Sequence, residues 1–178
     1  MHPEDTVTTA ATTPARRLSP GTRRAVLTLH IVASVGLLGD SAGYLAVAVR
    51  SAAADAPQVA AAGWDTLDMF SLTFGIPLSV TALISGLTLG IGSKWGVFRY
   101  PWVTTKLALI VAVMLVGTAV IGPGLEQATQ GSDSGEALLI AGAAFDVVAL
   151  SLATGLSVYK PGGRWRSAGL PGPARRAT

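Results

Sequence analysis

The chain has 178 residues, of which 50% are hydrophobic and 13% are charged. A soluble domain typically carries about 25% charged residues, so this composition predicts a membrane protein with one compact domain. The chain contains no cysteine, which excludes disulfides and thiolate metal sites, and its two histidines leave little material for a zinc site. The net charge of +3 is unevenly distributed and follows the topology described below, so it does not indicate nucleic-acid binding.

Four apolar runs follow a polar N-terminal tail. This tail, residues 1–23, is rich in Thr, Ala and Pro and lacks periodicity, so we expect it to be disordered. Each apolar run is close to the about 20 residues with which a helix crosses a bilayer, and none alternates as a barrel strand would. Residues 160–178 are basic and rich in Pro and Gly, and we expect a second disordered tail there. The transmembrane domain is predicted over residues 24–159, with spans at about 25–49, 70–91, 103–121 and 137–159.

Lysine and arginine residues predict how these helices are oriented. Twelve of the 13 lie in the N-terminal tail, between the second and third runs up to Lys106, or in the C-terminal tail, whereas Arg50 lies on the other side. The positive-inside rule therefore places both termini in the cytoplasm. The predicted fold is an all-α transmembrane four-helix bundle with up-down-up-down topology, N-in and C-in, in a cytoplasmic (inner) membrane.

The connection between the second and third spans alternates aromatic and basic residues. Trp and Tyr favour the headgroup level of a membrane, and Lys and Arg on this side face anionic lipid. A dedicated lipid or partner site is the alternative to an interfacial anchor. We expect the anchor to consist of Lys94, Trp95, Arg99, Tyr100 and Trp102.

Small residues recur at helical spacing in three of the spans. Small side chains let membrane helices approach closely, so we expect each group to face another helix of the bundle. Homo-oligomerisation through one of these faces is the alternative. The groups are Gly39-x-x-x-Gly43, Gly86-x-x-x-Gly90, and the stripe of Gly142, Asp146, Ala149 and Ala153.

Two aspartates, Asp40 and Asp146, lie inside apolar runs, where a carboxylate is costly. Both lie about 15 Å from the outer ends of their spans if a helix rises about 1.5 Å per residue. No Lys or Arg occurs at that depth. If the two carboxyl groups are close, we expect at least one to be protonated at neutral pH, or the pair to share a proton.

A polar stripe on the first span accompanies Asp40. Ser34, Ser41 and Tyr44 follow His30 at helical spacing, so this face should point into the bundle. Proton or cation handling, and a ligand site, are two functional interpretations of the buried polar residues. The structural alternative is a protonated Asp that is hydrogen-bonded to a Ser, a Thr or a backbone carbonyl and holds the helices in register.

His30 lies near the cytoplasmic end of the first span. An interhelical hydrogen bond is its structural interpretation, and a haem or metal ligand is its functional one. Haem b in membranes generally has two axial ligands, and the other histidine, His2, lies in the tail, so bis-His ligation would need two protomers. Lys106, near the same surface, would then pair with a haem propionate. Met114 is the one methionine deep in a span, so the sequence gives little support to a methionine copper relay, and we name no residue as a metal ligand with a defined site.

Two stretches carry a family resemblance. They are residues 29–36, LHIVASVG, and residues 93–99, SKWGVFR, which lead to Trp102, Val103 and Lys106. Over roughly residues 27–123 the chain resembles a family of predicted bacterial integral membrane proteins with four helices and a domain of unknown function. The resemblance implies this architecture and brings no activity and no catalytic residue. The first helix, with His at its start and Gly in its middle, is also similar to the copper-resistance D membrane family, although this chain lacks the Met, His or Cys set that would carry copper.

These observations favour a small non-enzymatic membrane component that assists transport or an envelope process. A haem- or quinone-associated redox subunit centred on His30 is the first alternative. A small proton-coupled transporter that uses Asp40 and Asp146 is the second. A membrane hydrolase is disfavoured, because no Ser-His-Asp arrangement or metal-ligand spacing occurs in the sequence. The expected partners are the lipid bilayer and further copies of the chain.

Overall fold

The computed structural model describes residues 18–92 and 100–159, and those residues form helices joined by short connections. The two π-helices, η1 and η2, continue the α-helices on either side of them, so the chain makes four long helical segments. The elements are α1 (Pro20–Ala52), α2 (Pro57–Phe70), η1 (Ser71–Gly75), α3 (Ile76–Ile91), α4 (Pro101–Val116), η2 (Gly117–Ile121), α5 (Gly122–Thr129) and α6 (Asp133–Tyr159).

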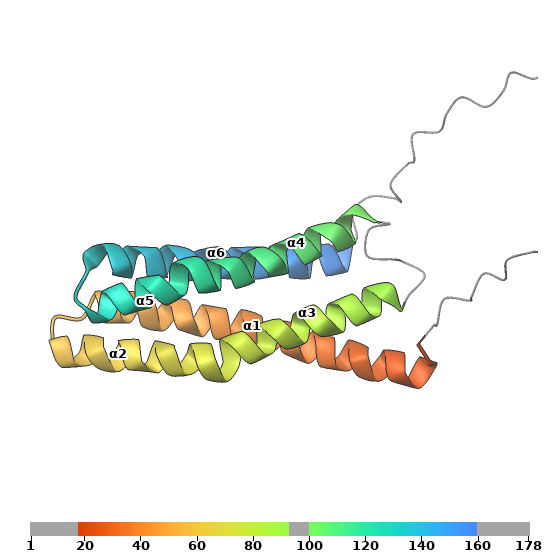
Figure 1. The fold of residues 1–178 in the computed structure, drawn as a ribbon, viewed down its shortest axis with the longest axis horizontal. Helices are drawn as coiled ribbons and strands as arrows, with labels where there is room; N and C mark the ends of the chain where they lie inside the picture. The colour runs from red at the N-terminus through yellow and green to blue at the C-terminus, as the bar shows by residue number, and fades with distance from the viewer. Residues whose placement is uncertain (1–17, 93–99, 160–178) are drawn as a thin grey trace, which may run out of the picture.

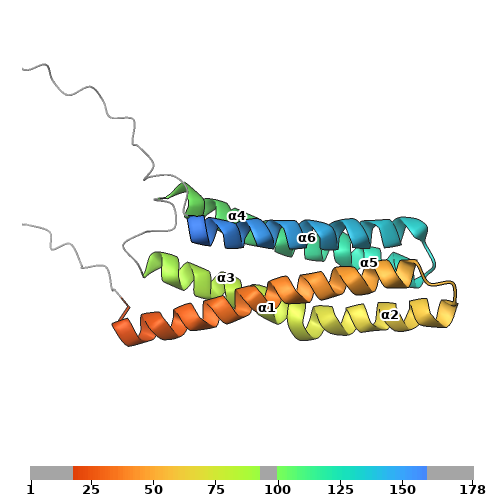
Figure 2. The ribbon, with the colours of Figure 1, turned by 180° about the vertical axis from the view of Figure 1, so that it is seen from behind.

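The four segments run antiparallel to one another in chain order (Figure 1). Seen from behind, α1 and α6 lie on one face of the bundle, and the segments α2–η1–α3 and α4–η2–α5 lie on the other (Figure 2). The helix α1 packs against α2, α3 and α6, and α6 packs against α4 and α5. The prediction of an all-α, four-helix bundle is confirmed, whereas its orientation in the membrane stays a prediction.

All four segments are long and apolar enough to cross a membrane. The segment Pro57–Ile91 has 35 residues and α1 has 33, so each is about 50 Å long, against about 30 Å for a hydrocarbon core. Helices of this length extend beyond the hydrocarbon when they cross it with little tilt. The carboxylates of α2 and α5 make the end near the α1–α2 and α5–α6 connections the polar one.

Large apolar side chains lie both inside the bundle and on its outer surface, whereas small residues recur where the helices meet. Buried residues of α1 recur every three or four positions from Ala33 to Ser51, which is the spacing of one helical face. Large side chains such as Ile84, Leu115 and Val158 are exposed along the bundle. Membrane helices associate through small residues because lipid offers their apolar side chains the same environment as a core. This arrangement fits helices that are surrounded by hydrocarbon.

The small-residue groups differ in what they face. A Cβ atom added at Gly142 would lie 2.7 Å from Ile121 Cγ1, so this glycine permits a close contact between α6 and η2. One added at Gly86 would lie 3.0 Å from Cε1 of His30, which joins α3 to α1. The expectation is wrong for Gly39, which is exposed and has no described atom within 4 Å of an added Cβ.

The predicted anchor falls partly outside the structure. Lys94, Trp95 and Arg99 lie outside the described residues, as do most of the two predicted tails. Tyr100 and Trp102 lie at the start of α4, with ring centroids 6.4 Å apart. The ammonium of Lys106 lies 5.7 Å from the centroid of the Trp102 ring, a cation–π distance. The anchor itself stays a prediction.

Candidate functional site

A cavity of about 740 Å³ lies inside the bundle. Its lining residues come from the second and third helical segments and from α1 and α6. It lies between two apolar clusters, one that includes Tyr44 and Ile121 and another that includes Leu37 and Val113, and all four residues reach its wall. The cavity is therefore a gap between two packed layers of the core.

Buried polar side chains line this cavity. Asp146 is 7% exposed and Tyr44 is 5% exposed, whereas Asp40 is half-buried. Within the part of the chain that the structure describes, Oδ1 of each aspartate is buried without a hydrogen-bond partner. Buried polar atoms are normally paired, so two unpaired carboxyl oxygens on one cavity indicate a site for a ligand, an ion or a proton.

The two aspartates come from α1 and α6, as the sequence analysis expects, and the structure brings both to the same cavity. The structural alternative predicts that each aspartate is hydrogen-bonded to a Ser, a Thr or a backbone carbonyl. Among residues 18–92 and 100–159, Oδ1 of neither aspartate makes such a bond. Ser41 is buried on the cavity wall. Ser34 is half-buried, lies about two helical turns before Ser41 on α1, and does not line the cavity.

Three further carboxylates line the cavity from its polar end. Asp65 and Asp68 of α2 and Glu126 of α5 are exposed. Among the described residues that line the cavity, none is Lys, Arg or His. Carboxyl groups therefore line the cavity from its exposed end to Asp40 and Asp146. No basic side chain among the described lining residues lies opposite them.

Both π-helices contribute to the cavity wall. In η1 the N–H of Ile76 donates to the carbonyl of Ser71, and in η2 the N–H of Gly122 donates to the carbonyl of Gly117, so each bond spans five residues. A proline follows one residue later in both segments, Pro77 and Pro123, and a proline cannot donate the next helical bond. π-Helical turns occur frequently at functional sites.

The turn in η1 also brings its backbone close to Asp40. A Cβ atom added at Gly75 would lie 3.4 Å from Oδ2 of Asp40, so the absence of a side chain there lets the carboxyl group lie against the second segment. The hydroxyl of Ser79, which also lines the cavity, donates to the carbonyl of Ile76 at 2.9 Å.

His30 lies away from the cavity and joins α1 to α3. Its Nδ1 atom is 3.1 Å from the carbonyl oxygen of Ala82 and 3.0 Å from Oγ of Ser85. A carbonyl can only accept, so Nδ1 carries the hydrogen and Nε2 of the neutral ring does not. This is the interhelical hydrogen bond of the structural interpretation.

The haem interpretation of His30 stays a prediction. His2, which would supply the second axial ligand from another protomer, lies outside the described residues. Lys106 lies near enough to His30 for its charge to act on the imidazole, which matches their expected placement at one end of the bundle. Within residues 18–92 and 100–159, no group of three or more His, Asp or Glu side chains is placed to hold a metal ion.

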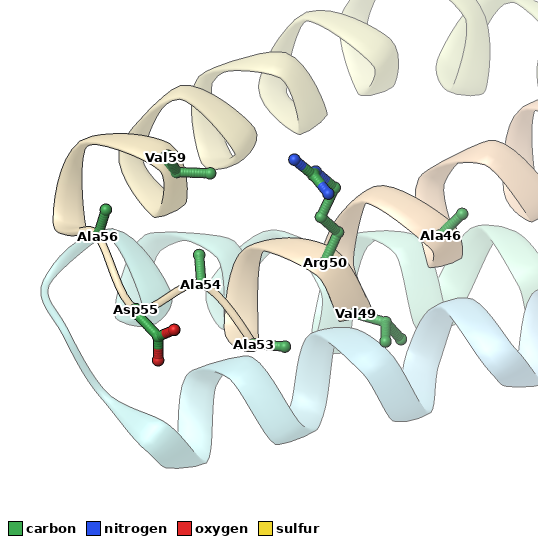
Figure 3. A pocket seen from close by; sticks show the side chains of 8 residues that line it. All are labelled: Ala46, Val49, Arg50, Ala53, Ala54, Asp55, Ala56 and Val59. Atoms are coloured by element: carbon green, nitrogen blue, oxygen red, sulfur yellow. The ribbon is translucent and has the colours of Figure 1, made fainter.

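A second hollow, of about 630 Å³, lies at the α1–α2 connection (Figure 3). It is open and is lined mostly by alanine and valine side chains, with Arg50 and Asp55 pointing in different directions. None of the buried unpaired polar atoms of the described residues belongs to its lining. It is therefore a surface hollow and a weaker candidate than the acidic cavity.

Sequence reasoning missed Trp64, Asp65, Asp68 and Glu126 as cavity residues. It treated residues 50–69 and 122–136 as loops, because they are too polar to extend an apolar run. A signal was present, since Asp65, Asp68, Gly75 and Ser79 follow a helical spacing that continues into the second span. Pro57 also occupies the first turn of α2, where proline favours a helix start.

Comparison with known proteins places this architecture in a family. A family model described as a predicted integral membrane protein (DUF2269) matches residues 24–156. The chain belongs to this family. Neither a curated protein nor a solved structure matches the chain. The DUF2269 match spans all four helical segments, and so includes every residue of the acidic cavity. The family description gives a membrane location and no biochemical role, and the likeness to the copper-resistance D family stays a prediction.

Proposed function

We propose that this DUF2269 protein is a small non-enzymatic component of a bacterial cytoplasmic membrane that takes up and releases protons at Asp40 and Asp146 during transport. One observation carries the proposal: the unpaired, buried Oδ1 atoms of both aspartates line a single cavity. A carboxylate that is buried without a cation is costly, and uptake of a proton removes that cost.

The charges around the pair favour cations. Asp40 and Tyr44 face the cavity from α1, Asp65 and Asp68 from α2, and no Lys, Arg or His of the described lining opposes them. Exposed carboxylates at the mouth of a cleft raise the local concentration of cations and protons. The polar end of the cavity therefore supplies protons, and the buried aspartates bind them.

The size of the bundle suggests that the protein works with others. Four helices are few for alternating access within a single copy, so we propose that several copies of the chain act together as a homo-oligomer. Protons then bind and leave at Asp40 and Asp146 of each copy.

Proton flux into liposomes tests the proposal. We would reconstitute the full chain, impose a pH gradient with the membrane potential clamped, and follow an enclosed pH-sensitive dye. Wild-type protein should carry protons, and Asp146→Asn and Asp40→Asn should reduce the flux to that of protein-free liposomes, because an amide does not titrate. Asp55→Asn is the matched control, since Asp55 is exposed and outside the cavity.

Each variant should elute from size exclusion as wild-type protein does, which shows that it folds. A well-folded Asp146→Asn variant that keeps wild-type flux would refute the proposal, as would wild-type liposomes with no flux above the protein-free level.

A further inference from the structure

The acidic cavity is larger than proton binding requires. Its volume of about 740 Å³ lies within the range of about 300–1,000 Å³ that small-molecule sites occupy. A proton relay needs only carboxyl groups and water in a narrow path. The volume therefore points to an organic ligand that shares the cavity with the protons.

The cavity wall combines aromatic rings with carboxylates. Trp64 of α2 is 4% exposed and Tyr44 of α1 is 5% exposed, and both line the cavity along with Asp40 and Asp146. The faces of Trp and Tyr rings attract organic cations, most strongly where water is excluded. Rings and carboxylates together suit a ligand that carries a positive charge.

The rest of the wall combines apolar side chains with the hydroxyl groups of Ser41, Ser71, Ser79, Thr118 and Thr129. Leu37, Ile76, Val113 and Leu125 reach the cavity from four different helices. Such a surface favours a ligand with a hydrocarbon body rather than a hydrated inorganic ion. The carboxylates also do not gather as a metal site would, since no group of three His, Asp or Glu among the described residues is placed to hold an ion.

We propose that the ligand of this cavity is a small organic cation with an apolar or aromatic body, of the amine or quaternary ammonium class. Its charge lies beside Asp146 and Asp40, and its body lies against Tyr44 and Trp64. Asp65, Asp68 and Glu126 at the exposed end attract it from water. This inference rests on the proposed function, because it names a ligand that competes with protons for the same two aspartates.

Calorimetric titration with benzyltrimethylammonium tests the inference. This probe has a fixed positive charge, an aromatic ring and no titratable proton, and benzenesulfonate is its anionic counterpart. The full chain in detergent should bind the cation and not the anion. Asp146→Asn should weaken binding at least about tenfold, and Asp55→Asn should leave it unchanged.

Two further variants keep the test decisive if Asp146→Asn fails to fold. Asp40→Asn removes the half-buried carboxylate, and Trp64→Leu removes a ring; each should weaken binding several-fold, whereas Trp64→Phe should retain most of it.

Lower pH should weaken binding of the probe, because protons compete for Asp40, Asp65, Asp68, Glu126 and Asp146, the carboxylates of the cavity.

The outcomes separate this inference from the proposed function. Equal binding to wild type and to folded Asp146→Asn and Asp40→Asn, or equal binding of anion and cation, would overturn the inference. Absence of probe binding together with Asp146-dependent proton flux would overturn it too, and would leave the proposed function standing. Probe binding that depends on Asp146, without any proton flux, would support the cation site and refute proton transport.

Discussion

His30 and Asp146 are both polar side chains inside an apolar bundle, but they differ in whether their polar atoms have hydrogen-bond partners. Nδ1 of His30 is held by Ala82 and Ser85 of α3. Oδ1 of Asp146 is buried with no hydrogen-bond partner among the residues that the structure describes. A satisfied group joins helices, whereas an unsatisfied one costs stability unless something binds to it. His30 accordingly fits a structural role, and Asp146 a functional one.

The contact between His30 and Ser85 should have a measurable coupling energy. In a double-mutant cycle of His30→Ala and Ser85→Ala, followed by denaturant titration in mixed micelles, we expect coupling of about 0.6 to 1.7 kcal/mol, as for other hydrogen bonds between membrane helices. Thr88→Ala is the control, because Thr88 donates to its own helix at Ile84 and should show no coupling with His30. A coupling energy near zero for the Ser85 pair would contradict the structural role.

At the scale of helices, the shape of the cavity depends on the π-helical turns within the second and third helical segments. The π-helices η1 and η2 both lie at its wall, and a proline two residues after each prevents a regular α-helical bond there. The wide turn of η1 lets Asp40 approach Gly75, and η2 packs through Ile121 against Gly142 of α6. The irregular turns thus place the second and third segments around the two aspartates.

Gly142 and Gly39 offer a matched test of this packing. Gly142→Ala should destabilise the protein by about 1–3 kcal/mol, because its Cβ would lie 2.7 Å from Ile121 Cγ1 in a packed contact. Gly39→Ala should leave stability unchanged or raise it slightly, since Gly39 is exposed and alanine favours a helix. Thermal unfolding in detergent, followed by tryptophan fluorescence, would measure both. Similar melting temperatures for the two variants would contradict the close contact of α6 with η2.

At the scale of the whole molecule, charge is distributed along the bundle axis. Arg23, Arg24 and Lys106 lie near one end, and the carboxylates of the α2 and α5 segments lie toward the other. With the positive-inside rule, this asymmetry predicts that the acidic cavity opens on the face opposite the cytoplasm.

The absence of cysteine from the sequence allows a direct test of that orientation. Ala53→Cys and Gln130→Cys, in the two connections at the acidic end, should react with a membrane-impermeant maleimide in intact spheroplasts. Tyr159→Cys, exposed at the other end of α6, should react only after lysis. The reverse labelling pattern would show that the positive-inside prediction is wrong for this chain.

The sequence by itself determined the fold class and the presence of four apolar helices, because runs of about 20 apolar residues have few alternatives in a membrane. It also singled out Asp40, Asp146 and His30, because a polar group in hydrocarbon is conspicuous. Tertiary structure alone decided which of these groups are satisfied. It paired His30 with α3, brought the two aspartates to one cavity with Trp64, Asp65, Asp68 and Glu126, and left Gly39 on the surface. Those outcomes depend on which face each helix turns toward its neighbours and on where a π-helical turn changes that face. The hydropathy of the sequence shows neither of these.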